Sequence, residues 1–434
     1  MKSFTEPCLL LLPVMLISTI QLGSRNSQPD RIRANTDGSI TVRLMSDNHE
    51  VQQLTNPKVV LRQTLIGENE ISWIGFSPDG RILVTENKVL RLFDTKTGLL
   101  KAKLMKTNGN LGTFIFSPDG KMLAVSTSSN KIDVWDVETG QLKRTLTGHK
   151  GSIWEIEFSP DGKQLLTSSS DKTVKLWDVK TGQLKATIRE HKGFLLKGAF
   201  IKASFSPDGN TFITTSSDDK TPRLWDAKTG ALKMMLKGHT ENVYDHSFSP
   251  NGQLVATASF DNTVKLWDTR SGLLKATLGG CYAYDFEFSP DGRLLATACS
   301  DGAARLWDVL ESQLIKILKM TYKRATTIDF SPNGQTLAVC HPDIDKCELW
   351  DVLTGQLLAT LTAKDGYKVK FSPDSRLLVA LDDKRRIKIW NVRSGELIST
   401  LDGAQWPAVF SPDGRVLATA GEKNTVLLWD VVVR

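Results

Sequence analysis

The chain has 434 residues, 40% of them hydrophobic and 24% charged, and its formal net charge is +7. This composition is typical of a folded soluble protein, and it excludes a disordered chain or one made of membrane-spanning segments. A basic balance can indicate nucleic acid or anionic surfaces. Here, however, the excess lysines recur singly at fixed spacing, and no run of like charge or arginine-rich tract occurs. The charge pattern therefore argues against a nucleic-acid partner.

Residues 1–24 have the pattern of a signal peptide or N-terminal anchor. Lys2 precedes an apolar run over residues 8–20, which is interrupted only by two hydroxyl residues. A run of this length suits the core of a signal peptide better than a membrane span of about 20 residues. Glu6 and the lack of a small-residue cleavage motif before Ser24 leave an uncleaved anchor open. We expect export to the periplasm, the extracellular space or a membrane-anchored position, with a cytoplasmic protein as the alternative.

Residues 25–57 are polar and mixed in charge, and we predict a linker there, in which residues 39–44 could form a short strand. Beyond it, the chain repeats one unit up to the C-terminus. The mark of this unit is Phe-Ser-Pro, then Asp or Asn, then Gly or Ser. It begins at Phe76, Phe116, Phe158, Phe205, Phe248, Phe288, Phe330, Phe371 and Phe410. Proline presets φ in such a turn and glycine tolerates positive φ.

Successive marks lie 40, 42, 47, 43, 40, 42, 41 and 39 residues apart. The copy that begins at His149 predicts four strands, over residues 153–158, 164–169, 173–178 and 183–188, because short alternating stretches are separated there by turn residues. A period near 40 residues with four strands in each unit is typical of propeller blades. The sequence therefore predicts an all-β fold made of four-stranded antiparallel blades.

The unit resembles a WD40 repeat, since Trp-Asp ends the predicted third strand in most copies. These tryptophans are Trp135, Trp177, Trp225, Trp267, Trp307, Trp350 and Trp429. Two copies depart from the pattern, at Phe93-Asp94 and Trp390-Asn391. The resemblance covers residues 58–434 and implies a single closed β-propeller.

The resemblance also implies a structural tetrad in each complete blade: a loop His, a second-strand Ser or Thr, a turn Asp and the third-strand Trp. Three copies have all four residues. They are His149, Ser169, Asp171 and Trp177; His191, Ser216, Asp218 and Trp225; and His239, Ser259, Asp261 and Trp267. A His-Ser-Asp grouping could suggest a hydrolytic triad. Because the grouping recurs once per blade with a tryptophan partner, we expect it to satisfy buried polar groups instead.

Ring closure follows from a missing strand. The last copy ends after its third strand, and residues 59–66 (VVLRQTLI) resemble the fourth strand of the other copies. We expect the N-terminal strand to complete the last blade and close the ring. This gives nine blades, with eight or seven as alternatives because propellers usually have four to eight. The predicted organisation is a signal peptide or anchor over 1–24, a polar linker over 25–57 and the propeller over 58–434.

The resemblance implies a binding face made of the fourth-to-first-strand loops and the second-to-third-strand turns. The residue four positions before each marked phenylalanine lies near it, and five of the nine are aromatic: Trp154, Tyr244, Tyr284, Tyr367 and Trp406. Aromatic residues are enriched at binding hot spots, although filling the wide centre of the ring is the alternative. Phe260, next to a tetrad aspartate, and Phe194, in an insertion over 192–202, are further candidates.

Four cysteines fall in two adjacent copies. Cys281 could pair with Cys299 and Cys340 with Cys347, because each pair lies on neighbouring predicted strands. Export would permit such disulfides, and burial as small apolar side chains is the alternative. The chain has no paired C-x-x-C zinc pattern, Walker loop, G-x-S-x-G or H-E-x-x-H motif. We therefore expect no metal, no cofactor and no catalytic residue.

The sequence as a whole predicts a non-enzymatic scaffold that binds a protein or peptide partner, as a monomeric ring within a larger complex. The alternative is an exported propeller that binds a glycan, or acts as an enzyme, with the aromatic residues as its platform. Glu155, Asp245 and Asp285, each next to one of those aromatics, are its acidic residues. Membrane contact is expected only through an uncleaved N-terminal segment.

Overall fold

The structure is a computed structural model. It describes residues 32–34, 40–42, 58–66, 71–86, 89–106, 113–189, 201–319, 325, 327–363, 369–382 and 384–432. The chain divides into two units, of which the smaller is Met1–Asn56 with Arg434 and the larger is Pro57–Val433. In the smaller unit, β1 (Ile32–Ala34) and β2 (Ile40–Val42) form an antiparallel hairpin inside the predicted linker. No helix among the described residues has the length and hydropathy to span a membrane; residues 1–24 lie outside them.

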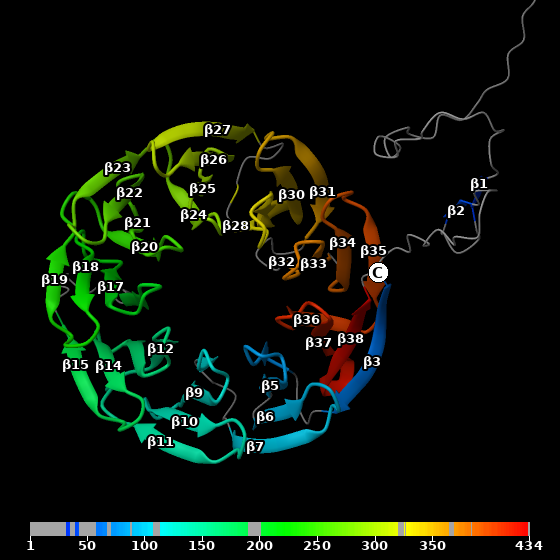
Figure 1. Ribbon diagram of the computed structural model, residues 1–434, viewed down its shortest axis with the longest axis horizontal. Helices are drawn as coiled ribbons and strands as arrows, with labels where there is room; N and C mark the ends of the chain where they lie inside the picture. The colour runs from blue at the N-terminus through cyan, green and yellow to red at the C-terminus, as the bar shows by residue number, and fades with distance from the viewer. Residues whose placement is uncertain are drawn as a thin grey trace, which may run out of the picture. The chain divides into compact units, whose positions relative to one another are not determined.

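In the larger unit, the described strands form nine four-stranded antiparallel sheets arranged around a ring (Figure 1). We number them as blades 1 to 9 in the order of their first strands. Blade 1 comprises β4 (Trp73–Phe76), β5 (Ile82–Glu86), β6 (Val89–Asp94) and β7 (Leu100–Lys106). Blade 2 comprises β8 (Phe114–Phe116), β9 (Met122–Ser126), β10 (Ile132–Asp136) and β11 (Leu142–Leu146). Blade 3 comprises β12 (Ile153–Phe158), β13 (Gln164–Ser169), β14 (Val174–Asp178) and β15 (Leu184–Ile188).

The middle of the ring follows the same order. Blade 4 comprises β16 (Ile201–Phe205), β17 (Thr211–Ser216), β18 (Arg223–Asp226) and β19 (Leu232–Met235). Blade 5 comprises β20 (Val243–Phe248), β21 (Leu254–Ser259), β22 (Thr263–Asp268) and β23 (Leu274–Leu278). Blade 6 comprises β24 (Ala283–Phe288), β25 (Leu294–Cys299), β26 (Ala303–Asp308) and β27 (Gln313–Lys319).

The last three blades complete the ring. Blade 7 comprises β28 (Thr327–Phe330), β29 (Thr336–His341), β30 (Lys346–Asp351) and β31 (Leu357–Thr362), with the 3-10 turn η1 (Pro342–Ile344). Blade 8 comprises β32 (Val369–Phe371), β33 (Leu377–Leu381), β34 (Ile387–Asn391) and β35 (Leu397–Leu401). Blade 9 comprises β36 (Ala404–Phe410), β37 (Val416–Gly421), β38 (Thr425–Val432) and β3 (Lys58–Ile66), with the 3-10 turn η2 (Glu422–Asn424). The predicted fold and its count of nine blades are confirmed.

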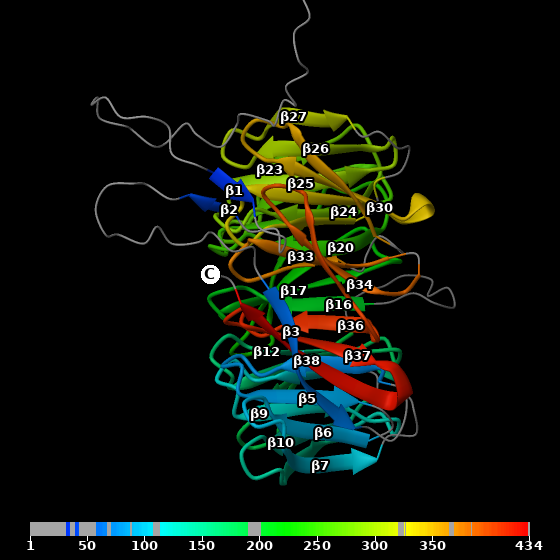
Figure 2. The ribbon, with the colours of Figure 1, turned by 90° about the vertical axis from the view of Figure 1, so that its right-hand side faces the viewer.

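The predicted closure is also confirmed. Strand β3 pairs antiparallel with β38, from Lys58 opposite Val432 to Ile66 opposite Thr425. Figure 2 shows the two strands side by side, with β3 in blue and β38 in red. Leu65 of β3 is buried with Ile71 and Ile74 near the start of blade 1 and with side chains of blade 9. The first and last blades are therefore joined by both backbone pairing and apolar packing.

The repeated turn explains the sequence mark. Gly162 has a φ of +69°, which favours glycine, and in blade 8 Ser375 takes a φ of +63° at the same position. The Ser159 hydroxyl donates to the Asp161 carboxylate at 2.7 Å and accepts from the backbone N–H of Gln164 at 2.9 Å. Each residue type in the mark thus has a task in closing the hairpin between the first and second strands.

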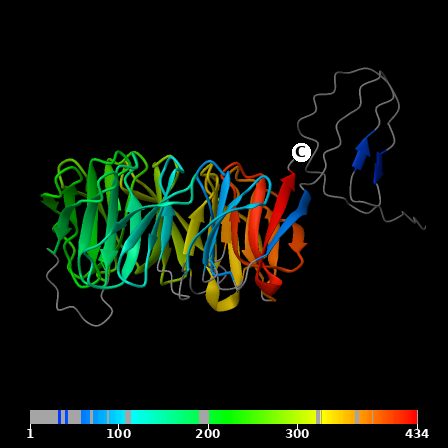
Figure 3. The same ribbon diagram turned by 90° about the horizontal axis from the view of Figure 1, so that it is seen from below.

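The connections form two faces. We call the loop face the one made by the fourth-to-first-strand loops and the second-to-third-strand turns. Turns η1 and η2 belong to it and lie on the lower side of the ring in Figure 3. The Phe-Ser-Pro turns and the third-to-fourth-strand turns form the opposite face. Consecutive residues of a strand alternate between sheet surfaces, and apolar clusters fill the space between neighbouring blades, as between blades 5 and 6.

Candidate binding surface

A buried hydrogen-bond network holds the loop face of blades 3 and 5. In blade 3, His149 Nδ1 lies 2.9 Å from Asp171 Oδ2 and His149 Nε2 lies 2.8 Å from Thr167 Oγ1. The indole N–H of Trp177 donates to the same Thr167 hydroxyl at 2.9 Å. Blade 5 repeats this arrangement with His239, Asp261, Thr257 and Trp267. The network joins the entering loop, the second strand, the turn and the third strand of one blade, which is a structural task.

The hydroxyl member differs from the predicted one. The prediction that Ser169 and Ser259 fill this position is wrong, because Trp177 lies opposite Leu165 and the next hydroxyl on that surface of the strand is Thr167. Ser169 lies beyond it and donates instead to the Gly151 carbonyl at 2.9 Å.

Ser259 likewise donates to the Glu241 carbonyl at 2.9 Å. In blade 4, the indole N–H of Trp225 donates to the Thr214 hydroxyl at 2.8 Å. The prediction that Ser216 is the partner of this tryptophan is therefore also wrong. Ser216 donates to Asp218. His191, the predicted fourth member, lies outside the described residues.

A sequence signal for this threonine exists. It is the residue nine positions after the marked phenylalanine, and it also accepts from the tryptophan in blades 6 and 9, through Thr297 and Thr419. Blades 2, 7 and 8 carry Val125, Val339 and Ala380 there. In those blades the indole nitrogens of Trp135, Trp350 and Trp390 are buried without a hydrogen-bond partner among the described residues. Within the described part of the chain, the hydrogen bond from the third-strand tryptophan is therefore present in blades 3, 4, 5, 6 and 9 and missing in blades 2, 7 and 8.

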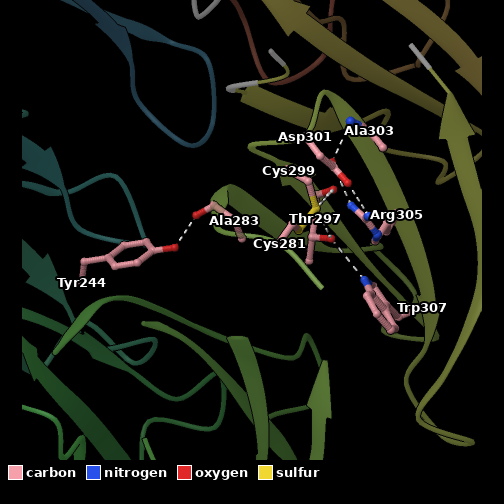
Figure 4. Close-up of a disulfide and its surroundings, with 9 residues drawn as sticks. All are labelled: Tyr244, Cys281, Ala283, Thr297, Cys299, Asp301, Ala303, Arg305 and Trp307. Carbon is pink, nitrogen blue, oxygen red and sulfur yellow. Dashed lines mark hydrogen bonds and ion pairs between the residues drawn. A yellow bond between two sulfur atoms is a disulfide. The ribbon is translucent and has the colours of Figure 1, made fainter. Parts of the chain in front are cut away.

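Disulfides join both cysteine pairs, Cys281 to Cys299 and Cys340 to Cys347. Cys281 and Cys299 occupy the repeat positions of Glu241 and Ser259, whose carbonyl and hydroxyl are hydrogen-bonded in blade 5. In blade 6, a covalent bond thus takes the place of that hydrogen bond (Figure 4). Gly279 stands where blade 5 has its tetrad histidine. The Cys281–Cys299 disulfide joins residues 18 positions apart. A disulfide that closes a loop of about this length stabilises a fold by about 3 kcal/mol.

Four aromatic side chains meet on the loop face at the boundary of blades 5 and 6. We call Tyr244, Phe260, Tyr282 and Tyr284 the aromatic cluster. The ring centroid of Tyr244 lies 5.0 Å from that of Phe260 and 5.3 Å from that of Tyr282. Tyr282 lies 5.1 Å from Tyr284 in an edge-on arrangement. These distances are those of favourable aromatic pairs.

A hydrogen bond across the blade boundary fixes the cluster. The Tyr244 hydroxyl of blade 5 donates to the Ala283 carbonyl of blade 6, as Figure 4 shows. Burial, and then the neighbouring Tyr282, raise the pKa of Tyr244, so the phenol stays a neutral donor at physiological pH. Phe260 keeps 48% of its surface exposed. The cluster is therefore a fixed support that presents one apolar ring to solvent.

The predicted aromatic residues do not form one continuous ring. Trp154 on β12 is exposed, and Trp406 on β36 is half-buried against the core between blades 8 and 9. Among the described residues, no ring contact connects either tryptophan to the aromatic cluster. Tyr367 and Phe194 lie outside the described residues. Sequence reasoning missed Tyr282, because it lies two residues before Tyr284 and outside the repeat position that identified the other tyrosines.

Carboxylates on the innermost strands connect neighbouring blades. Glu157 accepts from the backbone N–H of Phe205 at 3.3 Å, Asp285 from that of Ile328 at 3.1 Å, and Glu287 from that of Phe330 at 2.8 Å. Burial raises the pKa of Glu157 and of Glu287 to about 7 and that of Asp285 to about 6. These acids thus hold the next blade's first strand.

The other acidic candidates beside the aromatics are half-buried. Asp245 forms an ion pair with Lys202 of blade 4 at 3.0 Å. Burial raises the pKa of Glu155, and the nearby Lys202 charge opposes that shift. Among the described residues, no group of three or more His, Cys, Asp or Glu side chains is arranged to hold a metal ion.

These shifts predict that the propeller is more stable at about pH 5.5 than at about pH 8. A carboxyl whose pKa is raised by folding contributes stability below its unfolded pKa, and this contribution is lost as pH rises through the folded pKa. For Glu157, Asp285 and Glu287, this contribution to stability is lost as the pH rises through their folded pKa values of about 6 to 7. Burial lowers the pKa of His149 and His239, which opposes the trend because that stability is lost as pH falls below about 6.5. The carboxyls outnumber the histidines, so we expect the melting temperature to fall as pH rises.

Calorimetry of the wild type and of E157Q/E287Q across this range measures the effect. The glutamine amide can still accept from the backbone N–H but does not titrate, so the variant should show a flatter pH profile. Glu138→Gln is the matched control, because its side chain is exposed. A melting temperature that rises with pH in the wild type would contradict the prediction.

Comparisons with known proteins agree with this architecture. The family model described as IFT122 first beta-propeller matches residues 199–432. The model of the WD domain, G-beta repeat, matches residues 140–178, and that of the Anaphase-promoting complex subunit 4 WD40 domain matches residues 99–158. No curated protein sequence matches the chain significantly.

Among solved structures, the crystal structure of the computationally designed Ika8 protein is similar in fold. It is 24% identical, with a TM-score of 0.57, and the alignment covers 75% of this chain and 99% of that chain. The first family match alone spans more than half of the chain, and the described strands form the blades that such repeats build. On these grounds, the chain belongs to the WD40-repeat β-propeller family.

Proposed function

We propose that the chain is a scaffold that binds a protein or peptide partner through the aromatic cluster on its loop face. WD40 propellers generally act as protein-interaction scaffolds. The observation that carries the proposal is the exposed ring of Phe260 in the second-to-third-strand turn of blade 5, which is in ring contact with Tyr244 and Tyr282. An apolar ring that is exposed yet fixed loses little conformational entropy on binding, which is what a hot-spot residue requires.

The surroundings of the cluster favour a partner with an apolar anchor and polar flanks. Tyr282 and Phe260 lie in loop-face connections, so a ligand reaches them without rearrangement of the strands. On the inner strands of blades 5 and 4, Asp245 and Lys202 form a half-buried ion pair. The aromatic cluster and this ion pair of the adjoining strands together offer apolar and polar groups, which is the combination that protein–protein interfaces use.

The variant F260A/Y282A tests the proposal by quantitative affinity capture from a native extract. We expect the captured partner to decrease by at least about tenfold relative to the wild type, because losing a hot-spot aromatic costs about 2 kcal/mol or more. Trp73→Ala is the matched control, since Trp73 on blade 1 is 52% exposed and lies outside the cluster. Thermal unfolding of all three proteins verifies that each is folded.

Equal capture of the same proteins by the wild type, F260A/Y282A and W73A would show that the aromatic cluster is not the binding surface. A loss with W73A that matches the loss with F260A/Y282A would indicate a general effect of removing exposed aromatics.

A further inference from the structure

Blade 5 shows how an entering loop of this propeller is held to the turn beside it. The His239 ring lies 2.7 Å from the Asp261 carboxylate, and the backbone N–H of Thr240 donates to the same carboxylate at 3.0 Å. The Ser259 hydroxyl then donates to the Glu241 carbonyl at 2.9 Å. Blade 3 has the same three contacts. Hydrogen bonds to side chains thus fix three successive residues of the entering loop.

The entering loop of blade 6 has different residues at these positions. Gly279 and Gly280 replace the histidine and the threonine. Apart from their chain neighbours, no atom lies within 4 Å of the place that a Cβ would take on either glycine. Asp301, at the position of the tetrad aspartate, pairs with the Arg305 guanidinium of its own blade. The histidine contact is therefore lost, and the two glycines bring no side chain that could hold the loop in its place.

The Cys281–Cys299 disulfide supplies the side-chain link in this blade (Figure 4). Cys281 directly precedes Tyr282, and Cys299 is buried on β25 in register with Ala283. Beside the disulfide, the backbone N–H of Ser300 donates to the Tyr282 carbonyl at 2.9 Å. A single backbone hydrogen bond at the end of a strand opens readily when nothing else supports it. The disulfide is therefore the main restraint on the chain immediately before Tyr282.

Tyr282 contacts the three other members of the aromatic cluster. Its ring centroid lies 5.3 Å from that of Tyr244 and 5.9 Å from that of Phe260. The ring of Tyr284 lies 5.1 Å away, edge-on. If Tyr282 is displaced, Phe260 loses one of its two ring contacts. The disulfide thus determines whether the aromatic cluster is complete.

The two disulfides of the chain differ in access to solvent. Cys340 and Cys347 are 1% and 0% exposed. Cys281, in contrast, is partly exposed on the loop face, and only its partner Cys299 is buried. Reduction by thiol exchange requires a thiolate to reach one of the two sulfurs, so exposed disulfides are the labile ones. A dithiol should therefore open the Cys281–Cys299 disulfide first.

We propose that the Cys281–Cys299 disulfide is a redox switch for partner binding at the aromatic cluster, an inference that rests on the proposed function. A thiolate of a dithiol reductant attacks the Cys281 sulfur, the disulfide breaks, and Cys299 leaves as a thiolate that takes up a proton. The second thiol of the reductant then displaces Cys281 from the mixed disulfide. The reductant becomes a cyclic disulfide, and its two electrons reduce the cystine to two thiols.

The two thiols then behave differently. Cys299 stays buried on β25, where its sulfur lies 3.7 Å from the Thr297 hydroxyl. Cys281 lies on the loop with the two glycines, so it moves away with Tyr282. The oxidised protein binds its partner, and the reduced protein presents an incomplete cluster.

Titration of the full chain with dithiothreitol tests the order of reduction. Samples are alkylated with iodoacetamide, and mass spectrometry identifies the labelled cysteines. We expect labelling of Cys281 and Cys299 at dithiothreitol concentrations that leave Cys340 and Cys347 oxidised.

Hydrogen exchange of the same samples tests the release of the loop without any partner. In the reduced wild type, the amides of residues 279–285 should exchange at least about tenfold faster than in the oxidised protein. Residues 239–242, in the equivalent loop of blade 5, are the internal control and should not change.

Two variants that differ by one hydroxyl test the control of binding. C281A/C299A removes the link, whereas C281A/C299S leaves at position 299 a hydroxyl that can donate to the carbonyl of residue 281, as Ser259 does to that of Glu241. Immobilised protein is treated with dithiothreitol and washed before native extract is added, so the partner never meets the reductant. We expect treatment to lower capture by the wild type about tenfold. C281A/C299A should capture little with or without treatment, and C281A/C299S should capture well in both cases.

Four results would overturn the switch. The first is equal exchange of residues 279–285 in the oxidised and the reduced wild type. The second is reduction of Cys340–Cys347 before Cys281–Cys299. The third is a response of C281A/C299S to dithiothreitol, since the sensitive group would then lie elsewhere. The fourth is faster exchange without loss of capture, in an assay where F260A/Y282A does lose capture.

The variant F260A/Y282A also separates this inference from the proposed function. If it captures as much as the wild type, binding at the aromatic cluster is refuted, and with it the control of that binding. The hydrogen exchange of residues 279–285 then still decides whether the disulfide holds Tyr282 in place.

Discussion

Leu65→Asp is expected to lower the free energy of unfolding by about 4 kcal/mol, through loss of apolar packing and burial of a charge. Leu65 is 4% exposed and packs with Ile71 and Ile74 at the junction of blades 1 and 9. This junction is where the ring closes, because β3 comes from the N-terminal end of the propeller and its three partner strands come from the C-terminal end. A charge at Leu65 weakens the contact of β3 with the C-terminal strands of blade 9, which are joined to β3 by backbone pairing and packing.

Leu61→Asp is the control for this experiment. Leu61 lies on the same strand but is 46% exposed, so a carboxylate there stays hydrated and should cost less than about 1 kcal/mol. Chemical denaturation measures both free energies. Limited proteolysis locates the change, because opening of the ring should make residues 58–66 the first cleaved in L65D. Equal stability of the two variants would show that β3 does not hold the ring closed.

Thr257→Val is expected to lower the free energy of unfolding by about 3 kcal/mol. The Thr257 hydroxyl accepts from the Trp267 indole N–H and lies 2.8 Å from His239 Nε2, so its removal leaves two buried polar groups unsatisfied. Each such group costs about 1–3 kcal/mol. Valine has nearly the same shape as threonine, so lost packing contributes little. Urea unfolding, with the slope compared between wild type and variant, measures the change.

Val339→Thr provides the converse test in the same protein. Val339 is the equivalent of Thr257 in blade 7, where the Trp350 indole nitrogen is buried without a partner among the described residues. A hydroxyl there gives the indole an acceptor and should raise stability by about 1 kcal/mol. If Thr257→Val and Val339→Thr lower the free energy of unfolding equally, the loss comes from altering a buried side chain and not from the indole hydrogen bond.

Periodicity made the architecture predictable. Each copy of the mark ends one strand and closes the turn to the next, and turn geometry depends on residues within a few positions along the chain. The nine marks therefore predicted nine blades, and the missing fourth strand of the last copy predicted the pairing of β3 with β38, both of which the structure confirms. Local chemistry repeated at a fixed interval was sufficient for these predictions.

Side-chain partners were less predictable, since they depend on which surface of a strand each residue faces and on what lies in the next blade. The resemblance to the family implied Ser169 as the tetrad hydroxyl, but the strand register places Thr167 beside Trp177. One repeat position suggested a ring of separate aromatics. The structure instead joins Tyr244 and Tyr284 through Tyr282, a residue outside that position, and leaves Trp154 and Trp406 apart from them.

The sequence by itself determined the fold, the order of the strands and the way the ring closes, because these follow from short-range turns and from alternation within each unit. Only the tertiary structure decided which side chains meet. It brought Phe260 and Tyr282 together across a blade boundary and placed Leu353 of blade 7 beside β27 of blade 6. Contacts between residues far apart in the chain are set by the packing of one blade on the next, and no spacing within a single repeat encodes that geometry.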